Sequence, residues 1–206
     1  MRLVVFVAIA ASVLCSALPA GAYTITSSAG IHTTTAGATE FATFDAPANP
    51  SVATISGGTV CQPPGGCAGS TNPTSPVTAY LYMTSGMAPS DSATITFTAF
   101  QNYFGLVWGT PDTYNTIGFF SDSTFLAAFS GSDPGIAGND AFTNFTAANS
   151  TEFFNRIILV TLQCCFEVDN FAARAVVSAV PEPSTLALLA TGVGLSVLYV
   201  RRRYQR

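Results

Sequence analysis

Few residues of this chain could carry out catalysis. His32 is its only histidine, and the sequence contains no lysine. A Ser-His-Asp triad or a two-histidine metal site needs imidazole groups, and Schiff-base or P-loop chemistry needs a lysine. Paired carboxylates could hydrolyse glycosides, but most acids stand in turn sequences such as "PSDS" and "SDPG", where aspartate is expected for turn formation alone. We therefore predict a non-enzymatic protein without catalytic residues.

Calcium is the metal that the oxygen-bearing side chains would suit. The loop sequence "SDPGIAGND" contains Asp133, Asn139 and Asp140, which offer the hard oxygen ligands that Ca²⁺ prefers. The later stretch "FEVDN" adds three more candidates: Glu167, Asp169 and Asn170. Neither stretch matches an EF-hand loop, and turn capping explains these residues equally well. No firm metal site and no cofactor are expected, with calcium kept as the weaker alternative.

The aromatic stretch "NYFGLVWGTPDTYNTIGFF" is the candidate for glycan binding. Trp108 and Tyr114 could stack on sugar rings, while Asp112 and Asn115 could hold sugar hydroxyl groups. The alternative is that Trp108 fills a core and that residues 109–112 form a turn. The sequence favours this second interpretation.

Four cysteines follow the N-terminal hydrophobic stretch, and their even number in an exported chain favours two disulfides. "CQPPGGC" could close on itself through Cys61 and Cys67, which would leave Cys164 paired with its neighbour Cys165. Cross-linking of this loop to residues 164–165 remains open. A zinc site is disfavoured because the spacing lacks two C-x-x-C arms.

The elements that must position these residues have a period of two rather than 3.6. In "ATITFTAF", threonines alternate with apolar residues, as in a half-buried strand. Further strand candidates are "EFATF", "SVATIS", "TAYLYM", "YFGLVW", "TIGFF", "TFLAAF", "AFTNFT", "FFNRIILVTL" and "FEVDNFAA", separated by turn-formers. We predict an all-β ectodomain over residues 23–179, an antiparallel β-sandwich of jelly-roll type. Residues 23–39 would be a leader or an edge strand.

The charge of this ectodomain excludes nucleic acid as a partner. Arg156 and Arg174 stand against ten acidic residues, which gives a formal net charge of −8. An acidic, lysine-free domain lacks the positive surface that nucleic acid or anionic lipid would need.

The N-terminus predicts export. Arg2 precedes the apolar stretch Leu3–Leu14, and small residues follow up to Ala22, after which we place signal cleavage. The apolar stretch is too short to span a bilayer, because a helix rising ~1.5 Å per residue needs about 20 residues. The Sec translocon and signal peptidase are therefore expected partners of residues 1–22.

The C-terminus ends in a second hydrophobic stretch, within residues 180–206. Leu186–Val200 would cover roughly 22 Å as a helix, and the arginines at 201–203 would stop transfer and keep the C-terminus cytoplasmic. Before it, Pro181 and Pro183 flank Glu182; they fix the backbone as an extended segment that a protease can bind.

These C-terminal residues resemble the sorting signal of bacterial PEP-CTERM proteins. Pro181-Glu182-Pro183, the membrane segment 186–200 and Arg201, Arg202 and Arg203 follow its order and spacing. The resemblance implies that an exosortase, an integral-membrane enzyme, is a partner. It also implies a Gram-negative host that makes exopolysaccharide, transient insertion in the inner membrane, and release to the cell surface or extracellular matrix.

The ectodomain is also similar to one group of these proteins, over roughly residues 77–172. The group has a "YFG-x-x-WG-x-x-D-x-YN" stretch before a late "FE-x-DN" strand. The matching residues are Tyr103-Phe104-Gly105, Trp108-Gly109, Asp112, Tyr114-Asn115, Phe166-Glu167 and Asp169-Asn170. This resemblance implies an architecture and no activity.

Three functions follow from the sequence. The leading one is a non-enzymatic surface or biofilm-matrix protein that is sorted by an exosortase and has exopolysaccharide as a candidate partner. The second is a lectin-like, glycan-binding module that uses calcium, and the third is a secreted glycan hydrolase.

Overall fold

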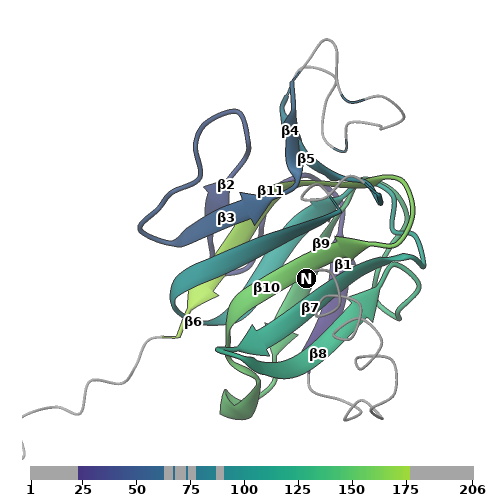
Figure 1. Ribbon diagram of the computed structural model, residues 1–206. Helices are drawn as coiled ribbons and strands as arrows, with labels where there is room; N and C mark the ends of the chain where they lie inside the picture. Colours follow the sequence, from purple (N-terminus) through teal and green to yellow (C-terminus); the bar gives the residue numbers. More distant parts are fainter. Residues whose placement is uncertain (1–22, 63–66, 68–72, 74–77, 87–90, 177–206) are drawn as a thin grey trace, which may run out of the picture. The chain divides into compact units, whose positions relative to one another are not determined.

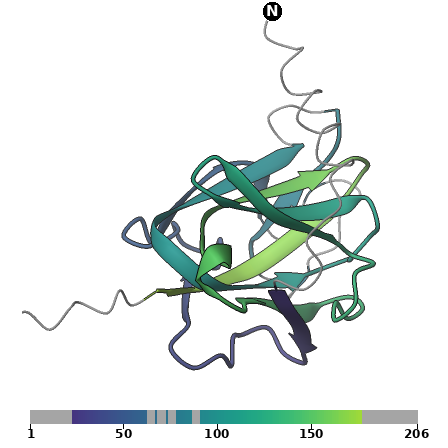
Figure 2. The ribbon, with the colours of Figure 1, turned by 90° about the horizontal axis from the view of Figure 1, so that it is seen from below.

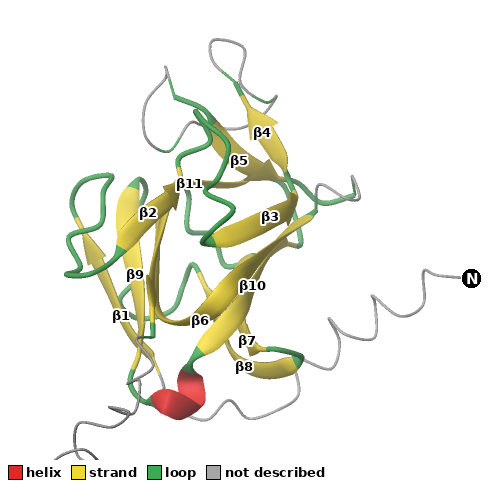
Figure 3. Ribbon diagram, turned by 90° about the vertical axis from the view of Figure 1, so that its left-hand side faces the viewer, coloured by secondary structure: helices red, strands yellow, loops and turns green. Residues whose placement is uncertain are grey.

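The computed structural model describes residues 23–62, 67, 73, 78–86 and 91–176. These residues form strands and one short 3-10 helix, η1 (Ser150–Glu152), as Figure 3 shows. The strands are β1 (Tyr23–Ser28), β2 (Thr39–Ala42), β3 (Ala53–Gly57), β4 (Thr59–Cys61), β5 (Tyr80–Met83), β6 (Ser92–Trp108), β7 (Asn115–Ser121), β8 (Thr124–Ser130), β9 (Ala141–Ala147), β10 (Phe154–Thr161) and β11 (Phe166–Ala175). Every strand pairing is antiparallel, so the predicted all-β antiparallel class is confirmed.

The long strand β6 explains how one sheet forms two layers. Its first part, up to Phe97, pairs with β3 and β10, and its second part, from Tyr103, pairs with β11 and β9. Between the two parts, Gln101 pairs with the first residue of β10 and the last residue of β11. β7 and β8 extend the first layer beyond β10, whereas β1 extends the second beyond β9. Strands β2, β5 and β4 complete the second layer on the far side of β11. Figures 1 and 3 show β9 and β1 on one side and β10, β7 and β8 on the other.

This arrangement differs from the predicted jelly roll in one respect. "ATITFTAF" and "YFGLVW" were expected to be two strands, but they are the two ends of β6. Residues 98–100 are exposed in succession, and burial resumes at Gln101, where the strand passes from one layer to the other. The layers are therefore joined through a shared strand instead of being separate sheets.

Aromatic rings fill the space between the layers. Phe97 packs edge-on against Phe154 with ring centroids 5.9 Å apart, and Phe154 packs against Phe119 at 5.0 Å. From the second layer, Phe104 and Phe171 meet at 5.5 Å. Such pairs add about 0.5–1.5 kcal/mol each to the free energy gained by burying their area. The phenylalanines that alternate along the predicted strands thus form the core.

The N-terminal residues of the described chain are part of the fold. β1 is an edge strand on β9, and the Tyr23 ring lies 4.8 Å from that of Phe119. The Tyr23 hydroxyl donates to the Glu152 carbonyl at 2.6 Å, and burial together with the Glu152 charge raises the pKa of Tyr23. The segment between β1 and β2 then packs on the outer face of the second layer, where it covers Tyr103 and Phe142. Figure 2 shows β1 and this segment below the sheet.

Two predicted segments lie outside the described residues. They are the signal peptide of residues 1–22 and the tail from residue 180, including the membrane segment 186–200. Among the residues that the structure describes, no helix is both long and apolar enough to cross a membrane.

Candidate functional site

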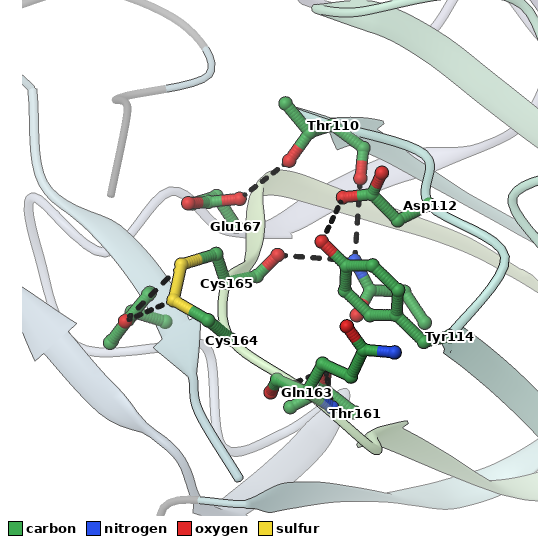
Figure 4. Close-up of a disulfide and its surroundings, with 10 residues drawn as sticks. Thr110, Asp112, Tyr114, Thr161, Gln163, Cys164, Cys165 and Glu167 are labelled. Atoms are coloured by element: carbon green, nitrogen blue, oxygen red, sulfur yellow. Dashed lines mark hydrogen bonds between the residues drawn. A yellow bond between two sulfur atoms is a disulfide. The ribbon is translucent and has the colours of Figure 1, made fainter. Parts of the chain in front are cut away.

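The four candidate glycan-binding residues lie where β6 ends and β7 and β11 begin. Figure 4 shows Asp112, Tyr114, Cys164 and Cys165 in this corner. Trp108 is the last residue of β6, Asn115 the first of β7 and Phe166 the first of β11. The connection between β6 and β7 and the turn before β11 therefore lie against each other. This corner holds all four candidate glycan-binding residues and the Cys164–Cys165 pair.

Trp108 belongs to the core, so it cannot act as a stacking platform for sugars. Its side chain is 0% exposed, and its ring is stacked on Phe166 with centroids 5.1 Å apart. The indole Nε1 has no hydrogen-bond partner among the described residues. The core-filling role that the sequence favoured for Trp108 is the one that the structure has.

Asn115 is likewise buried, at 0% exposure, and serves to join two loops. Its Nδ2 donates to the Thr110 carbonyl at 3.3 Å and to the Cys165 carbonyl at 3.1 Å. A fully buried amide cannot meet a sugar hydroxyl at the surface. Asn115 therefore does not fit the predicted glycan-binding role, because the fold uses it to hold the corner together.

Asp112 and Tyr114 are the two candidates that remain partly exposed. The Tyr114 hydroxyl donates to Asp112 Oδ2 at 2.7 Å, and this hydrogen bond is the main cause that raises the pKa of Tyr114 to about 12. The backbone carbonyl of Asp112 accepts from the amides of Asn115 and Gly131, at 3.1 and 3.2 Å. The pair is thus a rigid polar feature on a tightly bonded loop.

The carboxylates of "FEVDN" are buried in β11. Glu167 is 2% exposed and accepts from the Thr110 hydroxyl at 2.9 Å. The carbonyl of Glu167 also accepts from the Gly109 amide at 3.0 Å. Asp169 accepts from the amide of Asn170, whose side chain donates to the Ile31 carbonyl at 2.6 Å. These contacts stabilise this corner and the segment between β1 and β2.

The predicted calcium residues in the loop before β9 act in turns. Asp133 Oδ2 accepts from the Ser130 amide at 2.6 Å, as expected for a turn aspartate. Asn139 and Asp140 are exposed, and partial desolvation raises the pKa of Asp140. In the described part of the chain, no group of three or more His, Cys, Asp or Glu side chains could hold a metal ion.

The four cysteines form two disulfides at the same end of the molecule. Cys61 pairs with Cys67 and Cys164 with Cys165, across Cα distances of 5.5 and 3.7 Å. This is the pairing in which "CQPPGGC" closes on itself. Both pairs pack against the tyrosines of β5, Tyr80 and Tyr82.

An open groove beside β3 is a feature that the sequence does not indicate. The groove has a volume of about 560 Å³ and lies between the β2–β3 connection and the β3–β4 hairpin, where Phe44, Pro47, Ile55 and Val60 line it. Phe44 has a φ of +60°, which is rare for a bulky residue. "APANP" indicated only a turn, because a groove depends on how distant segments pack.

The comparisons with known proteins identify the tail. The PEP-CTERM protein-sorting motif matches residues 179–203, which confirms the predicted sorting signal. The motif supports an exosortase-targeted protein that is exported to the cell surface through a C-terminal, membrane-anchored sorting signal. Neither a curated protein nor a solved structure matches the chain. The matched residues lie outside the described part of the structure, so no geometry is given for Pro181–Pro183 or Arg201–Arg203.

Proposed function

We propose that this chain is a non-enzymatic surface or matrix protein of an exopolysaccharide-producing Gram-negative bacterium, processed by an exosortase. One observation carries the proposal: the sorting motif begins at residue 179, just after the sheet domain ends at Val176. In this proposal, the sheet domain is the part that is exported, and the tail is the signal that directs its sorting.

The proposed route has three steps. The Sec translocon exports the chain and signal peptidase cuts after Ala22, which leaves Tyr23 to start β1. The tail then holds the protein in the inner membrane, with Arg201–Arg203 in the cytoplasm. Finally the exosortase cuts near Pro181–Pro183, and the domain reaches the surface or the matrix, where exopolysaccharide is a candidate partner.

The non-enzymatic role is supported by how the described carboxylates are used. Glu167 and Asp169 are buried, and Asp133 holds a turn. Glu152 is buried beside η1, where it accepts from the Ala148 amide at 2.6 Å. Acids that stabilise the fold in this way are poorly placed to act as an acid and a base on a substrate. We propose no cofactor and no bound metal.

The test is the intact mass of the protein recovered from cells and from medium. With the exosortase gene present, we expect a chain that begins near Tyr23 and ends close to Pro181–Pro183. In a matched strain without that gene, the chain should keep Arg201–Arg206. A tail that is retained in both strains would contradict the proposal and would indicate a stable membrane anchor.

A glycan-binding module is the second candidate, and the exposed Asp112–Tyr114 pair favours it. Tyr114 offers a partly exposed ring next to a carboxylate, as a sugar site would require. Binding to a glycan array that is lost in Tyr114→Ala, with folding intact, would support this role, and loss on adding a chelator would indicate calcium. Glycan hydrolysis that is lost in Asp112→Asn would support the hydrolase instead.

A further inference from the structure

The two disulfides lie in one cluster but differ in how solvent reaches them. Cys61 is 2% exposed, and Tyr80, also 2% exposed, packs against it. The Cys67 amide donates to the Tyr80 hydroxyl at 3.4 Å. Protein atoms therefore shield at least one sulfur of the Cys61–Cys67 bond from attack.

The Cys164–Cys165 pair stands in an exposed turn between β10 and β11. Cys164 is exposed and Cys165 is half-buried, and the preceding Leu162 is 66% exposed. The Tyr82 hydroxyl lies 3.6 Å from Cys164 Sγ and 3.7 Å from Cys165 Sγ. Figure 4 shows the disulfide between Cys164 and Cys165. Cys164 is thus the more exposed member of the pair, whereas Cys165 packs against the cluster of Cys61, Tyr80 and Tyr82.

We propose that Cys164–Cys165 is a thiol–disulfide exchange site that reacts with the thiolate of a dithiol reductant or oxidoreductase, whereas Cys61–Cys67 is structural. Exposure decides between them, because exchange requires the thiolate to reach a sulfur along the S–S axis, and exposed disulfides are the labile ones. The inference concerns the folded domain and does not depend on the sorting pathway.

The chemistry needs only the dithiol partner. Its thiolate attacks Cys164 Sγ, a mixed disulfide forms at Cys164, and the electron pair of the broken S–S bond leaves on Cys165 Sγ, which takes up a proton. The partner's second thiol then displaces Cys164 as a thiol and closes the partner's own disulfide. The protein gains two electrons and two protons, and the partner loses them.

Tyr82 is placed to assist the leaving sulfur. Its hydroxyl can donate to the thiolate that forms on Cys165, and charge-assisted hydrogen bonds of this kind are stronger than neutral ones. Cys165 also has a φ of +79°, a left-handed conformation that is unfavourable for a residue with a side chain. Opening the S–S bond allows this backbone to relax.

Relaxation of this turn should change the contacts at the corner where β6 ends and β7 and β11 begin. The Cys165 carbonyl accepts from Asn115, and the Gln163 carbonyl accepts from the Ser85 amide at 2.9 Å. The Leu162 amide donates to the Tyr114 carbonyl at 3.1 Å. Reduction should therefore loosen the loop that carries Asp112 and Tyr114 without unfolding the core.

The experiment treats the folded, exported protein with increasing dithiothreitol, traps thiols by alkylation and maps the labelled peptides by mass spectrometry. Cys164 and Cys165 should be labelled on the order of tenfold faster than Cys61 and Cys67. Equal labelling of both pairs, or faster labelling of Cys61 and Cys67, would overturn the proposal. A non-reduced peptide map that links residue 61 or 67 to residue 164 or 165 would overturn it as well.

Two matched variants test the role of Tyr82. Tyr82→Phe removes the donor and should slow the opening of Cys164–Cys165 by roughly 2- to 10-fold, the effect of losing one hydrogen bond. Tyr80→Phe removes the hydroxyl that contacts the other disulfide loop and should leave the opening of Cys164–Cys165 unchanged. Equal effects of both variants would show that Tyr82 has no part in the exchange.

Discussion

Gly105 lies beneath two aromatic side chains on the outer face of the second layer. A Cβ built there would lie 2.9 Å from Phe142 Cζ and still closer to Phe142 Cε1 and the Tyr103 hydroxyl. Tyr103 is fully buried, and its hydroxyl is fixed by hydrogen bonds with Asn144 and Thr33 at 2.7 and 2.8 Å. Glycine at this place in the "YFG" motif thus allows both rings to lie close to the strand.

Replacing Gly105 by alanine should destabilise the domain. The added methyl group overpacks a site that cannot move freely, which typically costs about 1–3 kcal/mol of unfolding free energy. Urea unfolding followed by tyrosine and tryptophan fluorescence measures this loss. The control is Gly138→Ala, because a Cβ at Gly138 meets nothing within 4 Å, and it should change the unfolding free energy by less than about 0.5 kcal/mol. Equal effects of the two substitutions would contradict the packing argument.

The Tyr114–Asp112 hydrogen bond leads to a prediction about how the stability of the fold depends on pH. The phenol has an ordinary pKa of about 10, and the bond to Asp112 raises the pKa of Tyr114 to about 12. A group with a raised pKa stabilises the fold below the unfolded value and loses that contribution as pH rises through the folded value. The stabilisation by Tyr114 is therefore complete below about pH 10 and declines toward about pH 12.

Asp112→Asn should return the pKa of Tyr114 toward about 10, because a neutral amide neither repels a phenolate nor accepts as strong a hydrogen bond. The ultraviolet absorbance of phenolate during alkaline titration measures the shift. Tyr114→Phe serves as the reference, since it removes this one titrating group. A titration curve that is the same in the wild type and in Asp112→Asn would show that the two side chains are not coupled.

At the scale of elements, alternation in the sequence predicts the strands, but it does not predict how they connect into layers. The segments proposed as strands correspond to strands of the structure. The first part of β6 alternates buried and more exposed residues, whereas β5 and most of β11 are buried throughout and were found through their aromatic and β-branched residues. The continuity of β6 was missed. The sequence places residues 98–100 at the end of one strand and begins the next strand at Tyr103, whereas in the fold β6 runs on through residues 98–102 and passes from one layer to the other.

The 3-10 helix η1 depends on its cap. The Asn149 side chain accepts from the Thr151 amide at 2.9 Å, and Glu152 Oε2 accepts from the Asn149 amide at 3.3 Å. Asn149→Ala removes this cap and should lower the unfolding free energy by about 1 kcal/mol. Asn149→Ser keeps an oxygen that can accept at the cap and should retain part of it, whereas Asn149→Asp would set a second carboxylate against Glu152, to which Asn149 Nδ2 donates. Asn139→Ala, at an exposed loop position, is the control. If Asn139→Ala costs as much as Asn149→Ala in thermal or urea unfolding, the cap does not contribute.

At the scale of the whole molecule, the sequence predicts the C-terminal sorting signal better than it predicts the surface of the folded domain. Pro181–Pro183, the apolar stretch and Arg201–Arg203 form a linear signal, and the motif match over residues 179–203 confirms it. A surface site depends instead on which side chains remain exposed after folding. Trp108 and Asn115 have types and spacing suited to sugar binding, but distant strands bury them. The sheet edge, the groove and the accessibility of each disulfide likewise follow from long-range packing.

The division between the folded domain and the C-terminal tail leads to the last prediction. The strands of the described residues, the aromatic core and both disulfides lie before Val176, and the protein divides into two compact units between Val176 and Val177. A chain with a stop codon after residue 178 should therefore fold like the processed protein. Its unfolding midpoint should lie within about 2 °C of that protein, which corresponds to less than about 1 kcal/mol for a domain of this size. In the host, however, this chain should lack the membrane-bound precursor and accumulate independently of the exosortase gene. A midpoint lowered by about ten degrees would mean that the few residues after 178 that the processed protein keeps stabilise the sheet, because loss of the sorting signal alone does not change the free energy of unfolding.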